Sequence, residues 1–387
     1  MSKGLFNKYF TLCLIMQLLI MIAFNMSVPL IAKYVIYLGE SATVAGVIAG
    51  MFSLLALLYR PIAGFLTDRM SKKTMLIAGF ICNVVAFFGY ALTTIPWLLG
   101  VFRAIHAFGL CVQTTTTTVV AVSFVEQEHV GEGTGYVGLA TVLGVAIGPA
   151  IGVWAADTFG YFVSFAACGI ITALMLGVAA ILPIEHVPVT PKKLSFSDFV
   201  DVSVIPPAIV CAGFGFCSGL SSGFLALMGE ERGIPAITVF FLVASVGMIF
   251  SRPWSGRTVD KRGPNAVMPL SFVSEASGMA ITAFSYSIWP ILVAAVCRTF
   301  GQGVGQTAML GQAIKQSPPE KRGVVSSTVY MGVDFGQGFG AMAGGTLYDI
   351  GGYTTAYLSG AVVIALCAGV YFFWQRNKTT QDEKVAD

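Results

Sequence analysis

Six ionisable side chains lie deep inside apolar stretches of the sequence, where a charge is costly and is a candidate for function. They are Lys33, Arg103, His106, Glu275, Arg298 and Asp334. Arg298 has two potential carboxylate partners, Glu275 and Asp334, and one cation cannot fully compensate both. One of the two acids could therefore carry a proton. Alternatively, these charges form a permanent ion pair that only fixes helix packing.

Arg103 and Arg298 could instead bind an anion, because a guanidinium suits a carboxylate or a phosphate. His106 stands three residues after Arg103, about one helical turn, and could join such a site or carry the proton. A histidine inside an apolar helix can equally be a structural residue. Asn25 and Pro29 place a polar group and a helix break in the first apolar stretch, as expected of a helix that lines a pathway.

The composition points to a membrane. Of the 387 residues, 56% are hydrophobic and 11% are charged, and the mean hydropathy is +0.80, whereas an ordinary soluble domain is about 25% charged. We therefore expect an integral membrane protein and not a cytosolic enzyme. A net charge of +3 gives no reason to expect nucleic acid as a partner. The eight cysteines lack metal-ligand spacing, so no metal or other cofactor is expected.

A membrane-spanning helix needs about 20 mostly apolar residues, and the sequence offers twelve such stretches. They are 10–36, 42–66, 74–95, 97–121, 133–156, 160–182, 205–228, 236–256, 265–285, 288–314, 323–347 and 353–375. Short connections force neighbouring helices to run antiparallel, which predicts an all-α bundle. The polar segment 183–204 is a linker between a six-helix half at 1–182 and a second six-helix half, with a short tail, at 205–387.

Lysine and arginine are unequally divided between the two faces that these spans define. Sixteen lie on the face that holds both termini and the linker, and only Arg232 lies on the other. The positive-inside rule makes the crowded face cytosolic. The first apolar stretch is longer than the core of a signal peptide, about 7–15 residues, so we expect it to remain as the first span. The expected location is the cell (plasma) membrane, with multiple passes and both termini cytosolic.

The two halves carry an internal repeat at an offset of 192 residues. The matching pairs include Arg60 and Arg252, Pro61 and Pro253, Gly64 and Gly256, Asp68 and Asp260, Trp97 and Trp289, Gly144 and Gly336, Gly148 and Gly340, Gly152 and Gly344, and Asp157 and Asp349. Arg103 and Arg298 match at an offset of 195. A parallel duplication of six helices is the architecture of transporters that rock one half against the other around a site near the bilayer midplane.

Three motifs resemble signatures of the major facilitator superfamily, and the resemblance covers essentially the whole chain. Residues 64–73, GFLTDRMSKK, are similar to the family's cytosolic loop signature. Residues 103–109, RAIHAFG, are similar to its span-4 arginine motif, which usually has Gln where His106 stands. The third motif resembles the glycine-proline signature of the exporting, antiporter branch. Its residues are Gly135, Gly144, Gly148, Pro149 and Gly152. The resemblance implies a 12-helix bundle of two parallel six-helix repeats.

Glycines four residues apart let two membrane helices pack closely, and a proline beside them permits a bend. The glycine-proline motif therefore predicts a flexing interface, with a static packing groove as the alternative. Asp68, Arg69 and Asp260 stand at the cytosolic ends of helices. A carboxylate there could bond helix N-terminal amides or an arginine and latch the two halves in one state. The alternative is a solvated run of charges.

Asp334 is the predicted proton carrier, because its repeat partner is Val142 and the fold does not require an acid there. For Glu275 the packing role is favoured, since the ninth span of the family tends to be peripheral. His106 and Glu275 are the next candidates for the proton.

No phosphate-binding loop and no HExxH or GxSxG motif occurs, so we expect neither ATP hydrolysis nor another enzymatic activity. The resemblance implies a secondary transporter, a proton-coupled antiporter that exports small molecules. The alternative is an organic-anion importer or exchanger that uses Arg103 and Arg298. A transport-inactive sensor is a third hypothesis, which no sequence feature favours. The expected partners are a small-molecule substrate, protons and the lipid bilayer, with the protein as a monomer and no cofactor.

Overall fold

The computed structural model describes residues 7–126, 130–184, 200–317 and 322–386, and the chain divides into two compact units, Met1–Lys193 and Leu194–Asp387. The side chains of residues 64–65, 67–69, 122, 130–135, 260, 322–323 and 377–386 lie outside the description. The described residues form helices and turns with no strand among them, which confirms the predicted all-α fold. Most of the predicted linker, residues 185–199, is outside the described ranges.

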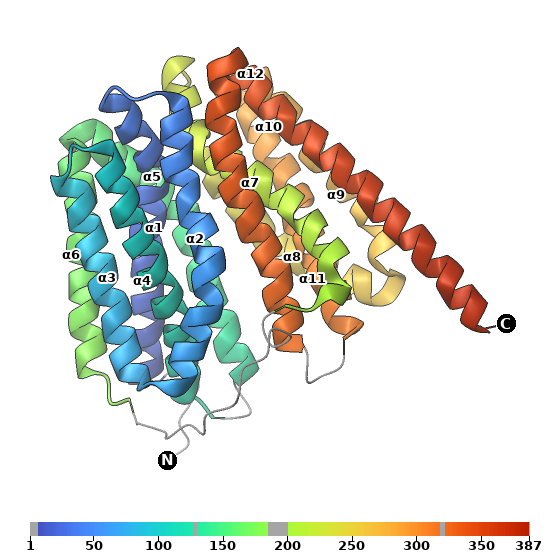
Figure 1. Cartoon of the computed structure of the whole chain (residues 1–387), viewed down its shortest axis with the longest axis horizontal. Coiled ribbons are helices and arrows are strands. Elements are labelled where there is room, and N and C mark those ends of the chain that lie inside the picture. Colours follow the sequence, from blue (N-terminus) through green and yellow to red (C-terminus); the bar gives the residue numbers. More distant parts are fainter. Residues whose placement is uncertain (1–6, 127–129, 185–199, 318–321, 387) are drawn as a thin grey trace. The chain divides into compact units, whose positions relative to one another are not determined.

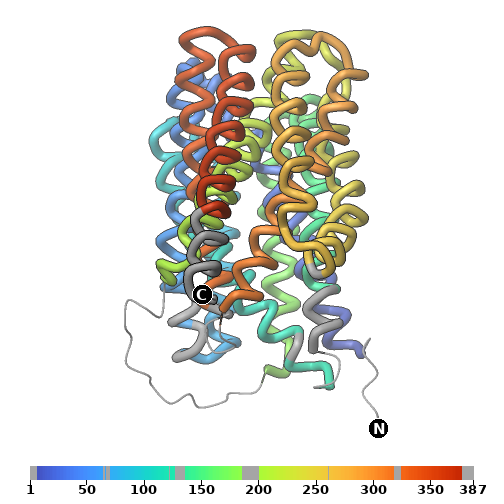
Figure 2. The backbone as a smooth tube through the Cα atoms, turned by 90° about the vertical axis from the view of Figure 1, so that its right-hand side faces the viewer, coloured from blue at the N-terminus to red at the C-terminus, as the bar shows by residue number. Residues whose placement is uncertain are grey.

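Unit 1 contains six helices, which run side by side in Figures 1 and 2. They are α1 (Lys8–Tyr37), α2 (Ala42–Arg69), α3 (Lys72–Leu92), α4 (Pro96–Ser123), α5 (Val130–Phe159) and α6 (Tyr161–Ile181). Polar side chains cap the first two: Asn7 accepts hydrogen bonds from two backbone N–H groups of α1, and Ser41 accepts one from α2. Gly160, at φ +85°, provides the sharp turn between α5 and α6. α1 packs against α5 and α6, and α3 packs against α4 and α6.

Unit 2 contains the remaining elements. They are η3 (Val202–Val204), α7 (Ile205–Glu231), α8 (Val239–Arg262), η4 (Pro264–Ala266), α9 (Met268–Ala283), α10 (Ile288–Arg298), η5 (Thr299–Gly303), α11 (Val304–Lys315) and α12 (Arg322–Ala386). α12 consists of two helices joined at Gly351 and Gly352, where the backbone leaves the helical region and Gly352 adopts φ +69°. α12 packs against α7 and α9, so it forms much of the core of this unit.

Ten helices of the described ranges are long and apolar enough to cross a membrane. The sequence predicted twelve spans. Two features account for the difference: α9 has only 16 residues, and the two helices of α12 are counted as one. Twelve spans therefore stay a prediction.

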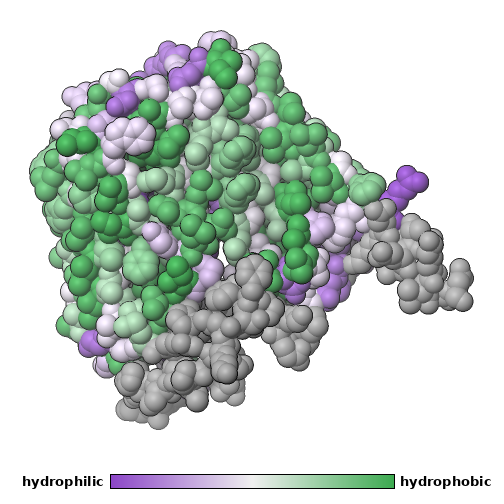
Figure 3. All heavy atoms as spheres, viewed as in Figure 1, coloured by the Kyte–Doolittle hydropathy of each residue, from purple (hydrophilic) through white to green (hydrophobic). Residues whose placement is uncertain are grey.

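The surface is largely apolar, as a lipid-facing protein requires. In Figure 3, hydrophobic residues cover most of the visible flank of the helices, and hydrophilic residues gather at their upper ends. Trp97 and Trp289, the second residues of α4 and α10 in the two halves of the repeat, are 62% and 74% exposed. Both indole rings are therefore free to lie at a membrane–water interface.

Candidate functional site

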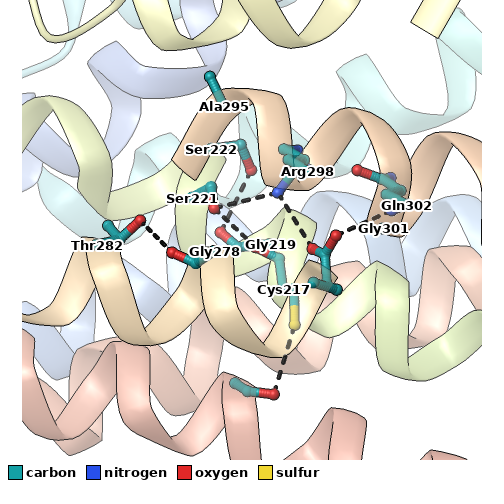
Figure 4. A network of polar contacts seen from close by, with 12 residues as sticks. Cys217, Gly219, Ser221, Ser222, Gly278, Thr282, Ala295, Arg298, Gly301 and Gln302 are labelled. Atoms are coloured by element: carbon teal, nitrogen blue, oxygen red, sulfur yellow. Dashed lines mark hydrogen bonds and ion pairs between the residues drawn. The ribbon is translucent and has the colours of Figure 1, made fainter. Parts of the chain in front are cut away.

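Glu275 and Arg298, two of the predicted site residues, meet inside unit 2. Glu275 Oε1 lies 3.8 Å from Nη1 of Arg298, and the two side chains are 1% and 8% exposed. The guanidinium also donates to Ser221 Oγ at 3.2 Å, as Figure 4 shows, and lies over the Phe240 ring, 5.7 Å from its centroid. Pairing the two charges in one buried place avoids the large cost that either would incur alone.

The other carboxylate oxygen of Glu275 is bonded to the main chain. Oε2 accepts a hydrogen bond of 2.9 Å from the backbone N–H of Gln302, which lies in the π-helical turn η5. Gly301 approaches so closely that a Cβ on it would overlap the Glu275 side chain. Sequence reasoning missed this turn, although Gly301 and Gly303 inside a spanning helix were a signal for it. Single π turns inside α-helices occur frequently at functional sites.

Arg103 has a different environment in unit 1. Its side chain is 2% exposed, Nη2 donates to Ala49 O at 2.8 Å, and Nε donates to Ile48 O at 3.4 Å. The guanidinium lies over the Phe52 ring, 4.7 Å from its centroid. Nη1 has no hydrogen-bond partner among the described residues. Carbonyl dipoles and a ring face therefore surround this cation where Arg298 has a carboxylate.

His106 is fully buried in an aromatic cage, one turn from Arg103 on α4. Its Nδ1 shares a hydrogen bond of 3.0 Å with the Tyr90 hydroxyl. The rings of Phe52 and Phe87 lie 5.4 Å and 4.5 Å from the imidazole, centroid to centroid. Nε2 has no partner in the part of the chain that the structure describes, so His106 retains one unused hydrogen-bonding position.

The glycines of the predicted packing motif lie against α1. A Cβ on Gly148 would stand 2.6 Å from the Cβ of Asn25, and Gly144 and Gly152 approach the same helix equally closely. Asn25 donates its amide to Met21 O at 2.8 Å, which satisfies this polar group within α1. The close approach of α1 and α5 therefore depends on glycine at these positions.

Pro149 lies inside α5, as the predicted motif requires. Gly135 also lies in α5, but in a stretch for which only the backbone is described. The predicted bending of α5 stays a prediction.

The same arrangement recurs in unit 2 between α7 and α12. Gly336 and Gly340, the repeat partners of Gly144 and Gly148, face the backbone carbonyls of α7. α7 adds Gly215 and Gly219, which face the backbone of α12 in return. Both halves of the repeat therefore use a glycine-lined contact between their first and fifth long helices.

The remaining predicted residues are Asp334, Asp68, Arg69 and Asp260. Asp334 is half-buried on the first helix of α12. Asp68 and Arg69 end α2, and Asp260 lies in the last turn of α8, but their side chains are outside the described part of the chain. The latch stays a prediction.

The contacts of the repeat correct the match between Arg103 and Arg298. In unit 1 a Cβ on Gly109 would stand 2.5 Å from Asn83 Oδ1, and in unit 2 the equivalent approach joins Gly301 and Glu275. Gly301 follows Gly109 by 192 residues, and Glu275 follows Asn83 by the same offset. The same offset matches Arg298 with His106, so these two residues hold the equivalent position on α4 and α10.

Sequence reasoning also missed an ion pair within unit 1. Lys33 Nζ lies 3.0 Å from Asp157 Oδ1, which joins α1 to α5. Lys33 is 4% exposed and Asp157 is 59% exposed. Asp157 was recognised only as a repeated position, and 124 residues separate the two partners.

Comparison with known proteins agrees with this architecture. The model of the family described as Major Facilitator Superfamily matches residues 13–274 and 246–386. The chain is 23% identical over 350 residues to the staphylopine export protein of Staphylococcus aureus, covering 85% of this chain and 87% of that protein. It is 23% identical over 355 residues to the multidrug resistance protein MdtH of Proteus mirabilis, covering 89% and 88%.

A solved structure of the nucleoside transporter NupG superposes with a TM-score of 0.75 at 12% identity, covering 94% of this chain and 99% of that one. At that identity the likeness describes the fold alone.

Proposed function

Because the chain belongs to the Major Facilitator Superfamily, we propose that it is a proton-coupled antiporter that exports small molecules by alternating access. Family membership makes it a membrane transporter, and the proposal adds the direction and the coupling ion. The outward direction is supported by relatives that are named for staphylopine export and for multidrug resistance. It is also supported by the glycine-proline motif of α5, which packs against α1.

One observation carries the proton coupling: the buried contact of Glu275 with Arg298. The carboxylate is 1% exposed, and its Oε1 has no hydrogen-bond partner among the described residues. A buried acid held by one weakly placed cation can exist in two protonation states, since neither state satisfies every group. An acid of this kind inside a membrane transporter is a candidate proton relay.

We also propose a membrane, an oligomeric state and an orientation for the transporter. We place the protein in the plasma membrane as a monomer with twelve spans, counting α9 and both helices of α12. Both termini and the linker 183–204 face the cytosol, as the basic residues indicate.

Transport by the purified protein in proteoliposomes tests the proposal. Cationic, neutral and anionic compounds would be loaded separately, and a proton gradient would be imposed with a pH-sensitive dye inside. Antiport predicts that substrate moves against its gradient and that protons move in the opposite direction. Substrate movement that is unchanged when the proton gradient is collapsed would overturn the coupling.

Arg103 favours a second candidate, an organic-anion importer or exchanger. This buried guanidinium has an unused N–H at Nη1 and forms no ion pair among the described residues. A carboxylate or phosphate of a substrate would supply the missing charge and acceptor. Selective transport of anions in the same assay would support this candidate.

A further inference from the structure

The π turn η5 is maintained by side chains from two neighbouring helices. Ser251 and Ser255 of α8 donate to the carbonyls of Thr299 and Val304, at 3.1 Å and 3.0 Å. Ser271 of α9 donates to the carbonyl of Gly301 at 2.6 Å. These serines satisfy the backbone groups that a π turn leaves poorly bonded.

Glu275 completes this set and is its only charged member in the described chain. Its carboxylate accepts a hydrogen bond from the N–H of Gln302. Side chains of other helices therefore bond both a backbone donor and several backbone acceptors at the turn. The four side chains are spaced four apart on each helix, Ser251 with Ser255 and Ser271 with Glu275, and therefore lie on one face of α8 and one face of α9. All four are at most 4% exposed.

The repeat provides an internal comparison with a neutral group at the same place. Asn83 lies against Gly109 as Glu275 lies against Gly301, but α4 is α-helical throughout and contains no π turn. Both polar atoms of the Asn83 side chain lack hydrogen-bond partners among the described residues. A neutral amide at this place thus leaves the helix regular, whereas the carboxylate captures a backbone N–H.

We propose that Glu275 is the proton-binding carboxylate of the transporter and that its protonation releases the π turn Thr299–Gly303. We call this coupling of Glu275 protonation to the π turn the switch. The proposal deepens the proposed function and rests on it for the role of the switch in transport. A proton from water binds the carboxylate, which becomes neutral. Arg298 then loses its counter-charge, and the Gln302 N–H loses a charge-assisted acceptor.

Release of the turn would change the helix around it. Converting a π turn to α-helix shifts one flank by one residue, which is a rotation of about 100° and a translation of about 1.5 Å. α10 and α11 would therefore present different side chains on the two sides of the turn. Loss of a proton would restore the carboxylate, the ion pair with Arg298 and the turn.

Other titratable groups also lie near this carboxylate. Arg298 of α10 contacts it, and Cys297 of α10 and Cys217 of α7 lie within electrostatic range. Tyr357 of α12 lies within electrostatic range of Arg298. Unlike these groups, Glu275 has a described hydrogen bond to the backbone of the turn, from the N–H of Gln302.

A native tryptophan can report the state of the turn. The ring of Trp254 on α8 lies 6.5 Å from that of Phe300, centroid to centroid, and Phe300 belongs to the turn. A variant of the full chain that retains Trp254 and replaces the other four tryptophans by Phe would be placed in lipid nanodiscs. Its emission would be recorded from pH 5 to pH 9 without substrate.

The proposal expects the Trp254 emission to titrate with one proton. Glu275→Asn reproduces the residue of the other half of the repeat, Asn83. In this variant and in Glu275→Gln, the Trp254 emission should keep at every pH the value that it has at acidic pH when Glu275 is present. Glu275→Asp should restore a titration with a shifted midpoint. An emission that does not change with pH, or that titrates equally in Glu275→Gln, would overturn the proposal.

Transport measured on the same variants separates this inference from the proposed function. Proton-driven antiport with a flat Trp254 emission would retain the function and reject the switch. A Glu275-dependent titration in a protein without proton-driven transport would retain the switch and reject the function.

Discussion

Tyr90 and His106 share a hydrogen bond of 3.0 Å between the hydroxyl oxygen and Nδ1, inside the aromatic cage of unit 1. Both side chains are fully buried. His106 holds the place that Arg298 holds in unit 2, so the two halves of the repeat have different polar groups at one position. In unit 1 the cage has no carboxylate among the described residues that contact His106, which indicates a structural role for this hydrogen bond.

Tyr90→Phe should therefore destabilise the protein by about 1–3 kcal/mol, because the buried Nδ1 of His106 loses its partner. Thermal unfolding of the purified protein in detergent would measure the change. Tyr37→Phe is the matched control, since Tyr37 is 71% exposed. Equal melting temperatures for the two variants would contradict the structural role.

Arg103→Met should distinguish the two candidate functions. If a substrate anion binds the unused N–H of Arg103, transport of organic anions should fall at least about tenfold, in line with a lost hydrogen bond to a charged group. Transport of cations and neutral compounds should change less. Arg103→Lys retains the charge without the planar fork and should recover part of the anion transport. Equal losses for all substrates would assign Arg103 to packing.

Much of the fold could be predicted because it depends on local composition. The positions of the helices follow from the lengths of the apolar stretches. The glycine contacts of α5 and α12 follow from the four-residue spacing of the glycines and from the repeat. In the site, Glu275 could be predicted as a possible partner of Arg298 from charge alone. The choice between Glu275 and Asp334 could not, since it depends on which helix faces Arg298.

The π turn η5 was beyond sequence reasoning for a different reason. Its bonds come from Ser251, Ser255 and Ser271 on two other helices, and each serine alone is an ordinary residue of an apolar helix. The pair of Lys33 and Asp157 was missed because its partners are 124 residues apart. These features arise from tertiary contacts and have no local signature.

Gly148→Ala should weaken the contact between α1 and α5. The new methyl group would stand 2.6 Å from the Cβ of Asn25 and 2.9 Å from the carbonyl oxygen of Ile22, so the helices must separate. Such overpacking costs about 1–3 kcal/mol, which thermal unfolding would detect. Gly138→Ala on the same helix is the control, because nothing lies within 4 Å of its Cβ. That variant should be unchanged or up to about 1 kcal/mol more stable.

Asp68→Asn tests the predicted latch at the end of α2 that the basic residues predict to be cytosolic. We expect slower turnover with unchanged insertion and melting temperature, because a charged contact of one conformational state is removed while the packing is kept. Transport rates in proteoliposomes, at matched amounts of folded protein, would measure it. Lys261→Gln removes an exposed charge near the corresponding end of α8 and serves as the control. Wild-type rates in Asp68→Asn would leave only a topological role for this residue.

Asp334→Asn and Glu275→Gln together decide which acid carries the proton. The sequence favoured Asp334, whereas the contact with Arg298 at 3.8 Å and the bond to the π turn favour Glu275. We expect Glu275→Gln to abolish uphill transport and its pH dependence while leaving downhill exchange measurable, because the neutral side chain resembles one protonation state. Asp334→Asn should retain uphill transport with an unchanged pH profile. If the two outcomes are reversed, Asp334 is the carrier, and the Glu275–Arg298 pair serves to hold α9 against α10.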